Sequence, residues 1–189
     1  MEPRSAQAGY WTNGELPANA RVGENTIITS EFAFKRFFSQ RNPALVIGPD
    51  CTMDGVHFAL GPQAFMTIGH HCYFVNAVLL CELEITVGNY VVIGWNTTIA
   101  DSDFHPIAPA ERIADAMACS PLGKGIARPE INRKPVILED DVWIGPHATI
   151  LKGVRLGAGC VIDAGSVVTH DVPPRARILG NPGQIVGEV

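Results

Sequence analysis

Residues 138–168 read LEDDVW, IGPHAT, ILKGVR, LGAGCV, IDAGSV and V, and this six-residue period never slips. The first position of each unit holds a large aliphatic residue: Leu138, Ile144, Ile150, Leu156, Ile162 and Val168. The fifth position holds a small or β-branched residue: Val142, Ala148, Val154, Cys160 and Ser166. A helix repeats its apolar residues every three or four positions and an ordinary strand every second, so neither alone explains this period.

A short strand followed by a corner does explain a period of six. Three such units close a triangular coil of about 18 residues, stacked about 4.8 Å from the next coil. The aliphatic position of each unit then points inward. Glycine follows it in Ile144-Gly145 and Leu156-Gly157, which suits corners where a β-carbon would be strained. The sequence therefore predicts an all-β protein, a single-stranded parallel β-helix, although the period alone gives no handedness.

Earlier units return in the same frame. VGNYVV, IGWNTT and IADSDF run from Val87, IGPDCT and MDGVHF run from Ile47, and the weaker VGENTI starts at Val22. The frame fails in four places, where we expect breaks in the helix: residues 29–45, 59–67, 74–80 and 103–134.

The domain boundaries follow from these units. We expect one domain, residues 1–189, with coils over about 16–102 and 135–172. A long protruding loop, about 103–134, separates the coils, and residues 173–189 form a short C-terminal tail. Long insertions in compact domains are usually functional or disordered, so the loop is the first place to look for a site.

Composition narrows the partners. The net charge of -5 makes nucleic acid an unsuitable partner, because a phosphate backbone requires a basic face. Residues 1–119 carry a charge of -6 and residues 120–189 carry +1, so a phosphorylated ligand would prefer the second part. The first 20 residues lack a signal-peptide core and no apolar stretch reaches membrane length, so we expect a cytoplasmic protein without a membrane partner.

Five cysteines without CxxC spacing argue against a disulfide framework and against a zinc site. Cys51, Cys72 and Cys160 occupy the small inward position, and Cys81 lies six residues before Val87. Burial therefore explains four of the five, and we expect free thiols rather than nucleophiles.

The run VILEDDVWIGPHATILKGVRLGAGCVIDAGSVVTHDVPPRARILGNPGQIV, residues 136–186, resembles the closing segment of hexapeptide-repeat acyltransferases. The ordered elements WIG, GAGC, DAGSVVT, DVPP and GNP are similar to those of the maltose, galactoside and nodulation sugar O-acetyltransferases. The resemblance implies a left-handed helix, against the usual right-handed crossover. It also implies acetyl-CoA as cosubstrate, a small hydroxylated acceptor and a homotrimer with active sites between neighbouring subunits.

In that family a histidine on the long loop leaving a mid-protein coil is the catalytic base. The corresponding segment, residues 97–112, reads TTIADSDFHPIAPAER, so the resemblance assigns this role to His105. An imidazole suits the task because it is largely unprotonated at neutral pH yet basic enough to take a hydroxyl proton. Carboxylates commonly orient such a ring, and the sequence leaves three candidates: Asp101, Asp103 and Glu111.

Acceptor contacts are implied for Asn76 and Glu82 in the segment YFVNAVLLCELE, where Glu84 competes with Glu82 because the spacing differs from the family's. Cofactor contacts are implied for Trp143 beside the pantetheine arm, and for Ala164 and Thr169.

The chain departs from the family at the cationic end of the coenzyme A site. His170, which we include among the cofactor contacts, stands where a lysine is usual. Gln184 and Gly187 stand where arginines commonly meet the phosphates. Other basic residues could supply that charge: Lys152, Arg155, Arg175 and Arg177.

Two alternatives to a sugar O-acetyltransferase remain open at this level. Xenobiotic and amino-sugar acetyltransferases share the closing segment and the loop histidine, and a catalytically silent scaffold or binding subunit would keep the helix without the chemistry. Carbonic anhydrases of the γ class also use this fold, but their zinc needs histidines at HxxxxH spacing, which the sequence lacks. We expect no metal.

Overall fold

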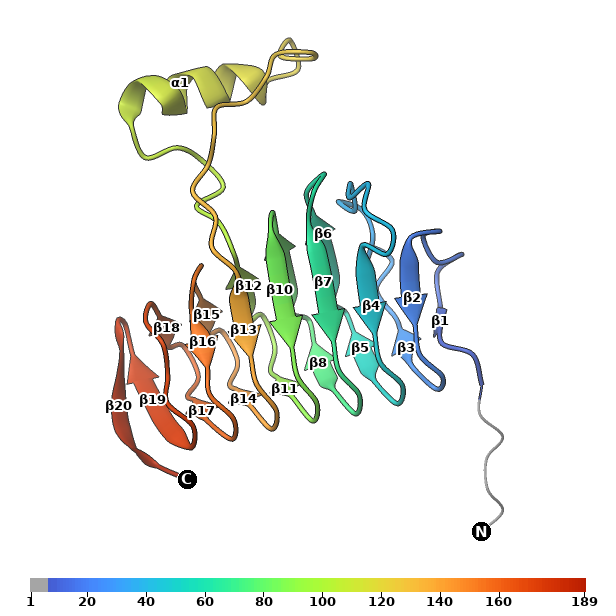
Figure 1. The fold of residues 1–189 in the computed structure, drawn as a ribbon, viewed down its shortest axis with the longest axis vertical. Helices are drawn as coiled ribbons and strands as arrows, with labels where there is room; N and C mark the ends of the chain where they lie inside the picture. Colours follow the sequence, from blue (N-terminus) through green and yellow to red (C-terminus); the bar gives the residue numbers. More distant parts are fainter. Residues whose placement is uncertain (1–6) are drawn as a thin grey trace.

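The computed structural model describes residues 7–189. The chain folds as a three-sided left-handed parallel β-helix with one helical excursion, α1 (Pro109–Ala118), projecting from it (Figure 1). The predicted fold class is confirmed.

Three sheets form the three sides. Face A contains β1 (Tyr10–Trp11), β3 (Ile27–Ile28), β5 (Thr52–Asp54), β8 (Tyr73–Val75), β11 (Val92–Ile93), β14 (Trp143–Ile144), β17 (Val161–Ile162), β19 (Ala176–Gly180) and β20 (Gly183–Glu188). Face B contains β2 (Ala20–Val22), β4 (Leu45–Ile47), β7 (Phe65–Ile68), β10 (Glu84–Val87), β13 (Val136–Leu138) and β16 (Arg155–Leu156). Face C contains β6 (His57–Leu60), β9 (Val78–Cys81), β12 (Thr98–Ala100), β15 (Thr149–Ile150) and β18 (Val167–Val168).

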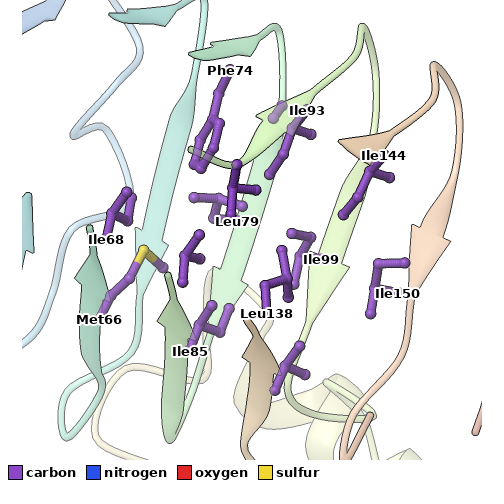
Figure 2. Packing of buried hydrophobic residues seen from close by; sticks show 14 of the residues in the cluster. Met66, Ile68, Phe74, Leu79, Ile85, Ile93, Ile99, Leu138, Ile144 and Ile150 are labelled. Carbon is purple, nitrogen blue, oxygen red and sulfur yellow. The ribbon is translucent and has the colours of Figure 1, made fainter. Parts of the chain in front are cut away.

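Register between the turns places like residues on top of one another. Along face B, aliphatic residues align in sequence from one turn to the next: Ile47, Ile68, Val87, Leu138 and Leu156. The side chains at the predicted inward positions of residues 138–168 are all at most 2% exposed, so their inward orientation is confirmed. Figure 2 shows such residues filling the interior between the sheets.

Two of the expected breaks are wrong. Residues 59–67 and 74–80 lie within regular turns, because β6, β7, β8 and β9 occupy them. The extra residues are absorbed at corners, which lengthens a turn without interrupting the pairing of its strands. The expected break at residues 29–45 is a real excursion between β3 and β4. Within it, Phe37 forms an isolated parallel bridge with Leu60 of β6, on face C.

The ends of the helix also differ from prediction. Pairing begins at Tyr10, before residue 16, because β1 adds a strand beside β3. Pairing also continues past residue 172: in the predicted tail, β19 continues face A in parallel, and β20 folds back on it in antiparallel orientation.

Corners are tight where face B turns into face A. A β-carbon on Gly48 would lie 2.7 Å from the carbonyl oxygen of Gly69 in the next turn, so only glycine fits.

Four of the five cysteines are buried, as predicted: Cys51, Cys72, Cys81 and Cys160. Burial raises the pKa of the Cys160 thiol to about 12 and that of Cys81 well above its ordinary range. The pKa of Cys51 is instead lowered to about 7, chiefly by hydrogen bonding from Cys72. Within residues 7–189, no helix has both the length and the apolar composition needed to span a membrane.

Candidate functional site

The loop at residues 103–134 leaves and rejoins the coil through a paired neck. The N–H of Asp103 donates to the carbonyl of Asn132 at 3.1 Å, and that of Lys134 donates to the carbonyl of Asp101 at 2.9 Å. Ser102 and Arg133 form an antiparallel bridge between them. The neck fixes the start of the loop, and therefore fixes the position of His105 just beyond it.

Helix α1 is a local consequence of the loop sequence. Pro109 occupies the first turn, where its missing N–H costs nothing and its fixed φ favours the helix. Glu111 in the same turn complements the helix dipole. Asp115 is the one helix residue that is buried, and its side chain points back toward the loop stem.

Asp115 connects His105 to Arg128. Its Oδ2 lies 2.5 Å from His105 Nδ1, and its Oδ1 accepts a hydrogen bond from Arg128 Nε at 2.6 Å. Arg128 also donates through Nη2 to the carbonyl of Phe104 at 2.7 Å. Since an ionised carboxylate can only accept, Nδ1 carries the proton and Nε2 of the neutral ring is free to take one.

Asp115 is stabilised in its ionised form, although it is buried. Hydrogen bonds from Arg128 first, and from His105 second, lower the pKa of Asp115 to about 2, although its side chain is fully buried. A buried carboxylate with two donors is stable as an anion, whereas the loss of either donor would leave it partly unpaired. The arrangement therefore keeps a permanent negative charge behind the His105 ring.

The structure corrects the expected orienting carboxylate. Asp101 does not contact His105; it is fully buried and accepts the backbone N–H groups of Glu82, Leu83 and Glu84, each at 2.7 Å. Asp103 instead pairs with Lys152 at 2.5 Å. Glu111 is exposed on the first turn of α1. All three candidates were wrong, because the excursion brings back a carboxylate ten residues further along.

A cavity of about 500 Å³ opens beside His105. It is lined by Arg36, Phe38, Ala59, Leu60, Gly61, Leu80, Glu82, Phe104, His105, Cys119 and Arg128. The side chain of His105 is 60% exposed, so the ring is reachable from this space. The floor is face C, and the walls are the excursion after β3 and the loop that carries α1.

Glu82 lines the same cavity as His105, whereas Glu84 does not. Partial burial raises the pKa of Glu82, and the positive charge of Arg128 opposes that rise. Asn76 lies at the corner between β8 and β9 with a positive φ of 48°, and it is not among the residues that line the cavity. Within one chain, the structure therefore brings Glu82 but not Asn76 to the candidate base.

The predicted cofactor residues lie on the turns that follow the loop. Trp143 projects from face A and is 50% exposed, and Ala164 lies at the corner after β17. Thr169 and His170 follow β18, with Thr169 Oγ1 2.7 Å from His170 Nδ1. None of the four lines the cavity beside His105.

Three of the four candidate cations for phosphate groups already have partners. Lys152 pairs with Asp103, Arg155 pairs with Glu139 and Arg177 pairs with Asp163. Arg175 has no carboxylate within 4 Å among the residues described. It is therefore the most available of these cations.

Residues 135–170 match the family model described as bacterial transferase hexapeptide (six repeats). The same residues form the stacked turns from β13 to β18. The chain is a hexapeptide-repeat protein.

Known proteins similar to this hexapeptide-repeat protein include acetyltransferases. The galactoside O-acetyltransferase of Lactococcus lactis subsp. lactis is 33% identical over 150 residues, 78% of this chain and 62% of that protein. A 2,3,4,5-tetrahydropyridine-2,6-dicarboxylate N-acetyltransferase of Staphylococcus aureus is 47% identical over 62 residues, 33% of this chain and 26% of that protein. The chain thus spans about three fifths of the first relative's length and about a quarter of the second's.

A solved structure extends the comparison. The crystal structure of a hexapeptide-repeat-containing acetyltransferase from Vibrio cholerae O1 biovar eltor, complexed with acetyl coenzyme A, matches at a TM-score of 0.52 and 26% identity. The match covers 90% of this chain and 70% of that one.

Sequence reasoning missed Asp115, Arg128 and Arg36 in this hexapeptide-repeat protein. No period marks residues inside either excursion, and their spacing from His105 carries no motif. Cys119 was the one cysteine outside the repeat frame, and it is the one exposed thiol in the described chain, at the cavity wall. Its exclusion from the frame was a usable signal.

Within residues 7–189, no group of three or more His, Cys, Asp or Glu side chains is arranged to hold a metal ion.

Proposed function

We propose that this protein is an acetyl-CoA-dependent O-acetyltransferase that acts on a sugar or another small hydroxylated acceptor, with His105 as general base. One observation carries the proposal: Asp115 fixes Nδ1 of His105 at the wall of a cavity of about 500 Å³. Nε2 has no hydrogen-bond partner among the described residues. The acetyltransferase relatives support the nature of the acyl donor.

The reaction that this geometry supports is a direct transfer. Nε2 of His105 takes the proton of the acceptor hydroxyl as its oxygen attacks the thioester carbonyl. The new C–O bond forms a tetrahedral oxyanion, which backbone N–H donors would stabilise. The C–S bond then breaks, and the imidazolium returns its proton to the leaving thiolate. Asp115 stabilises the imidazolium between these steps because its carboxylate remains ionised.

The acyl donor is proposed to bind along the turns after the loop. Trp143 offers a flat, half-exposed ring to a thin pantetheine chain. Ala164, Thr169 and His170 would contact the rest of the cofactor, and Arg175 is available for a phosphate. Asn76 is proposed as an acceptor contact supplied by a neighbouring subunit, because it lies away from His105 within its own chain.

A homotrimer is part of the proposal. Face A exposes a ladder of large side chains on adjacent strands, Tyr73, Val92 and Trp143, which are 48%, 37% and 50% exposed. Closed cyclic assembly would cover such a surface. We also propose a cytoplasmic location, where acetyl-CoA is available. Sedimentation equilibrium should give three times the chain mass, and a monomer would contradict this assembly.

The decisive test is acceptor-dependent thiol release from acetyl-CoA across a panel of sugars. We expect His105→Ala to lose roughly 100-fold or more in kcat while remaining folded. Both proteins should be assayed in a Cys119→Ser background, because the exposed thiol of native Cys119 would react with the reagent that detects the released coenzyme A thiol. An unimpaired His105→Ala would contradict the mechanism.

Amine acceptors should be assayed in parallel with the sugars, because one relative is an N-acetyltransferase. Amino sugars with the amine and hydroxyl at matched positions distinguish the two reactions. Calorimetry with acetyl-CoA tests the remaining alternative: absence of binding at millimolar ligand would favour a scaffold.

A further inference from the structure

A second cavity adjoins the one beside His105. It has a volume of about 310 Å³, and three of its lining residues, Arg36, Ala59 and Leu80, also line the first cavity. The two spaces therefore form one groove across strands β6 and β9 of face C. Phe32 and Lys35, from the excursion after β3, line only the second cavity.

This groove lies on one side of His105. The residues proposed to hold the acyl donor lie on turns after the loop, whereas the floor of the groove is built from turns before it. The acceptor would therefore approach through the groove. This step rests on the proposed function.

The groove has two chemically different ends. His105 and Glu82 line the first cavity, and Lys35 lines the far one, with Arg36 where the two meet. Neither Lys35 nor Arg36 has a carboxylate within 4 Å in the described part of the chain. Arg128, in contrast, is neutralised by Asp115.

The positive charges of Lys35 and Arg36 do not simply reflect an excess of basic residues in the chain. The chain carries a net charge of -5, yet two adjacent unpaired cations line this concave site. Lys35 Nζ lies 5.1 Å from the centroid of the Phe32 ring, which holds the charge over an apolar wall. A guanidinium and an ammonium together suit a carboxylate or a phosphate group.

We propose that the acceptor is an anionic hydroxylated molecule, with its carboxylate or phosphate at Lys35 and Arg36 and its reactive hydroxyl at His105. Glu82 would repel the anion from the catalytic end and accept a hydrogen bond from a hydroxyl group. The difference in charge between the two ends of the groove thus sets the direction in which the acceptor lies. Phe32 and Phe38 supply apolar walls for the carbon framework.

Matched acceptors test this proposal: glucose, glucuronate and glucose 6-phosphate, with glucuronate and the phosphate ester distinguishing the two anions. At least one anionic acceptor should exceed glucose by about 10-fold or more in kcat/KM. The double variant K35Q/R36Q should raise the KM for that acceptor about 10-fold or more with little change in kcat. Its effect on the KM for glucose should be smaller, because glucose carries no anionic group for Lys35 and Arg36 to bind, so the preference for the anionic acceptor falls.

Arg41→Gln is the matched control. Arg41 belongs to the same excursion but lies over the Phe65 ring, 4.7 Å from its centroid, and lines neither cavity. It should leave all three acceptors unchanged. Equal kcat/KM for neutral and anionic acceptors in the native protein would overturn the proposal, and so would an anionic KM unaffected by K35Q/R36Q.

Calorimetry separates this proposal from the proposed activity. Glucuronate and glucose 6-phosphate are titrated into the native protein and into K35Q/R36Q. Binding of either that is lost in the variant supports an anion site even if no acetyl transfer is found. Absence of binding by both to the native protein, or binding that survives the double substitution, overturns it.

Discussion

The stacked turns of residues 135–172 and the excursion of residues 103–134 adjoin in the chain but are stabilised by different forces. The turns bury an aliphatic side chain every six residues, each in register with the turn before. The excursion has one short helix, whose only buried residue is the charged Asp115. Several of its apolar side chains remain exposed, including Ile107, Ile113 and Leu122.

This difference separates stability from chemistry. A repeated apolar core tolerates little change in volume but has no reactive group. The excursion carries His105 and positions it through a single ionic network. We therefore expect substitutions in the turns to affect unfolding, and substitutions in the network to affect turnover.

The largest expected effect is in the turns. Ile150→Ala should lower the free energy of unfolding by about 2–5 kcal/mol, because it leaves a cavity at a fully buried position. Ile150→Val should lower it by only about 0.5–1.5 kcal/mol. Urea denaturation followed by circular dichroism measures both. Equal effects of the two substitutions would mean that the core is not tightly packed there.

Asp115→Asn should lower kcat by about 10- to 100-fold, less than His105→Ala, because the imidazole remains but loses its charged partner. The KM for acetyl-CoA should change little, and the pH profile of kcat should shift. Glu111→Gln on the same helix is the control and should behave like the native protein. If Asp115→Asn changed only the free energy of unfolding, the carboxylate would be structural.

Acid should loosen the excursion before the turns. The pKa of Asp115 lies below its ordinary value near 3.8, at about 2, so its contribution to stability is present above pH 4. That contribution is lost as the pH falls toward 2. Pepsin should cleave residues 103–134 increasingly between pH 4 and 2, measured relative to an unfolded substrate. Asp115→Asn should be cleaved readily over the whole range from pH 4 to 2. If it resisted pepsin as well as the native protein does, the ionic network of Asp115 would not be what holds the excursion in place.

The smallest perturbation concerns one thiol. Iodoacetamide should modify Cys119 alone in the folded protein, since the other four cysteines are buried. Mass spectrometry should find one adduct per chain, and acetyl transfer should fall because the adduct occupies the cavity wall. Cys119→Ser should take up no label and keep its activity. Labelling of Cys81 in the native protein would show that the turns open.

Much of the turn architecture could be predicted, because every six-residue unit needs an inward-pointing aliphatic side chain, and residues such as Ile144 and Leu156 recur at that position. The lengthened turn near Gly61 escaped this reasoning, since a corner absorbs extra residues without changing strand pairing. His105 could be proposed as the base from the family resemblance, together with its place directly after the unit IADSDF. Its partner Asp115 could not be, because Asp115 reaches His105 only after the excursion has turned back through α1.

The hairpin of β19 and β20 has a consequence for the length of the molecule. Each parallel turn presents an open ladder of backbone groups on which another turn could be added. On face A, β20 runs antiparallel to β19 and occupies that ladder with a strand that is mostly solvent-exposed. Because β20 already pairs with β19, a further parallel turn, from this chain or from another copy, cannot pair with β19 on this face.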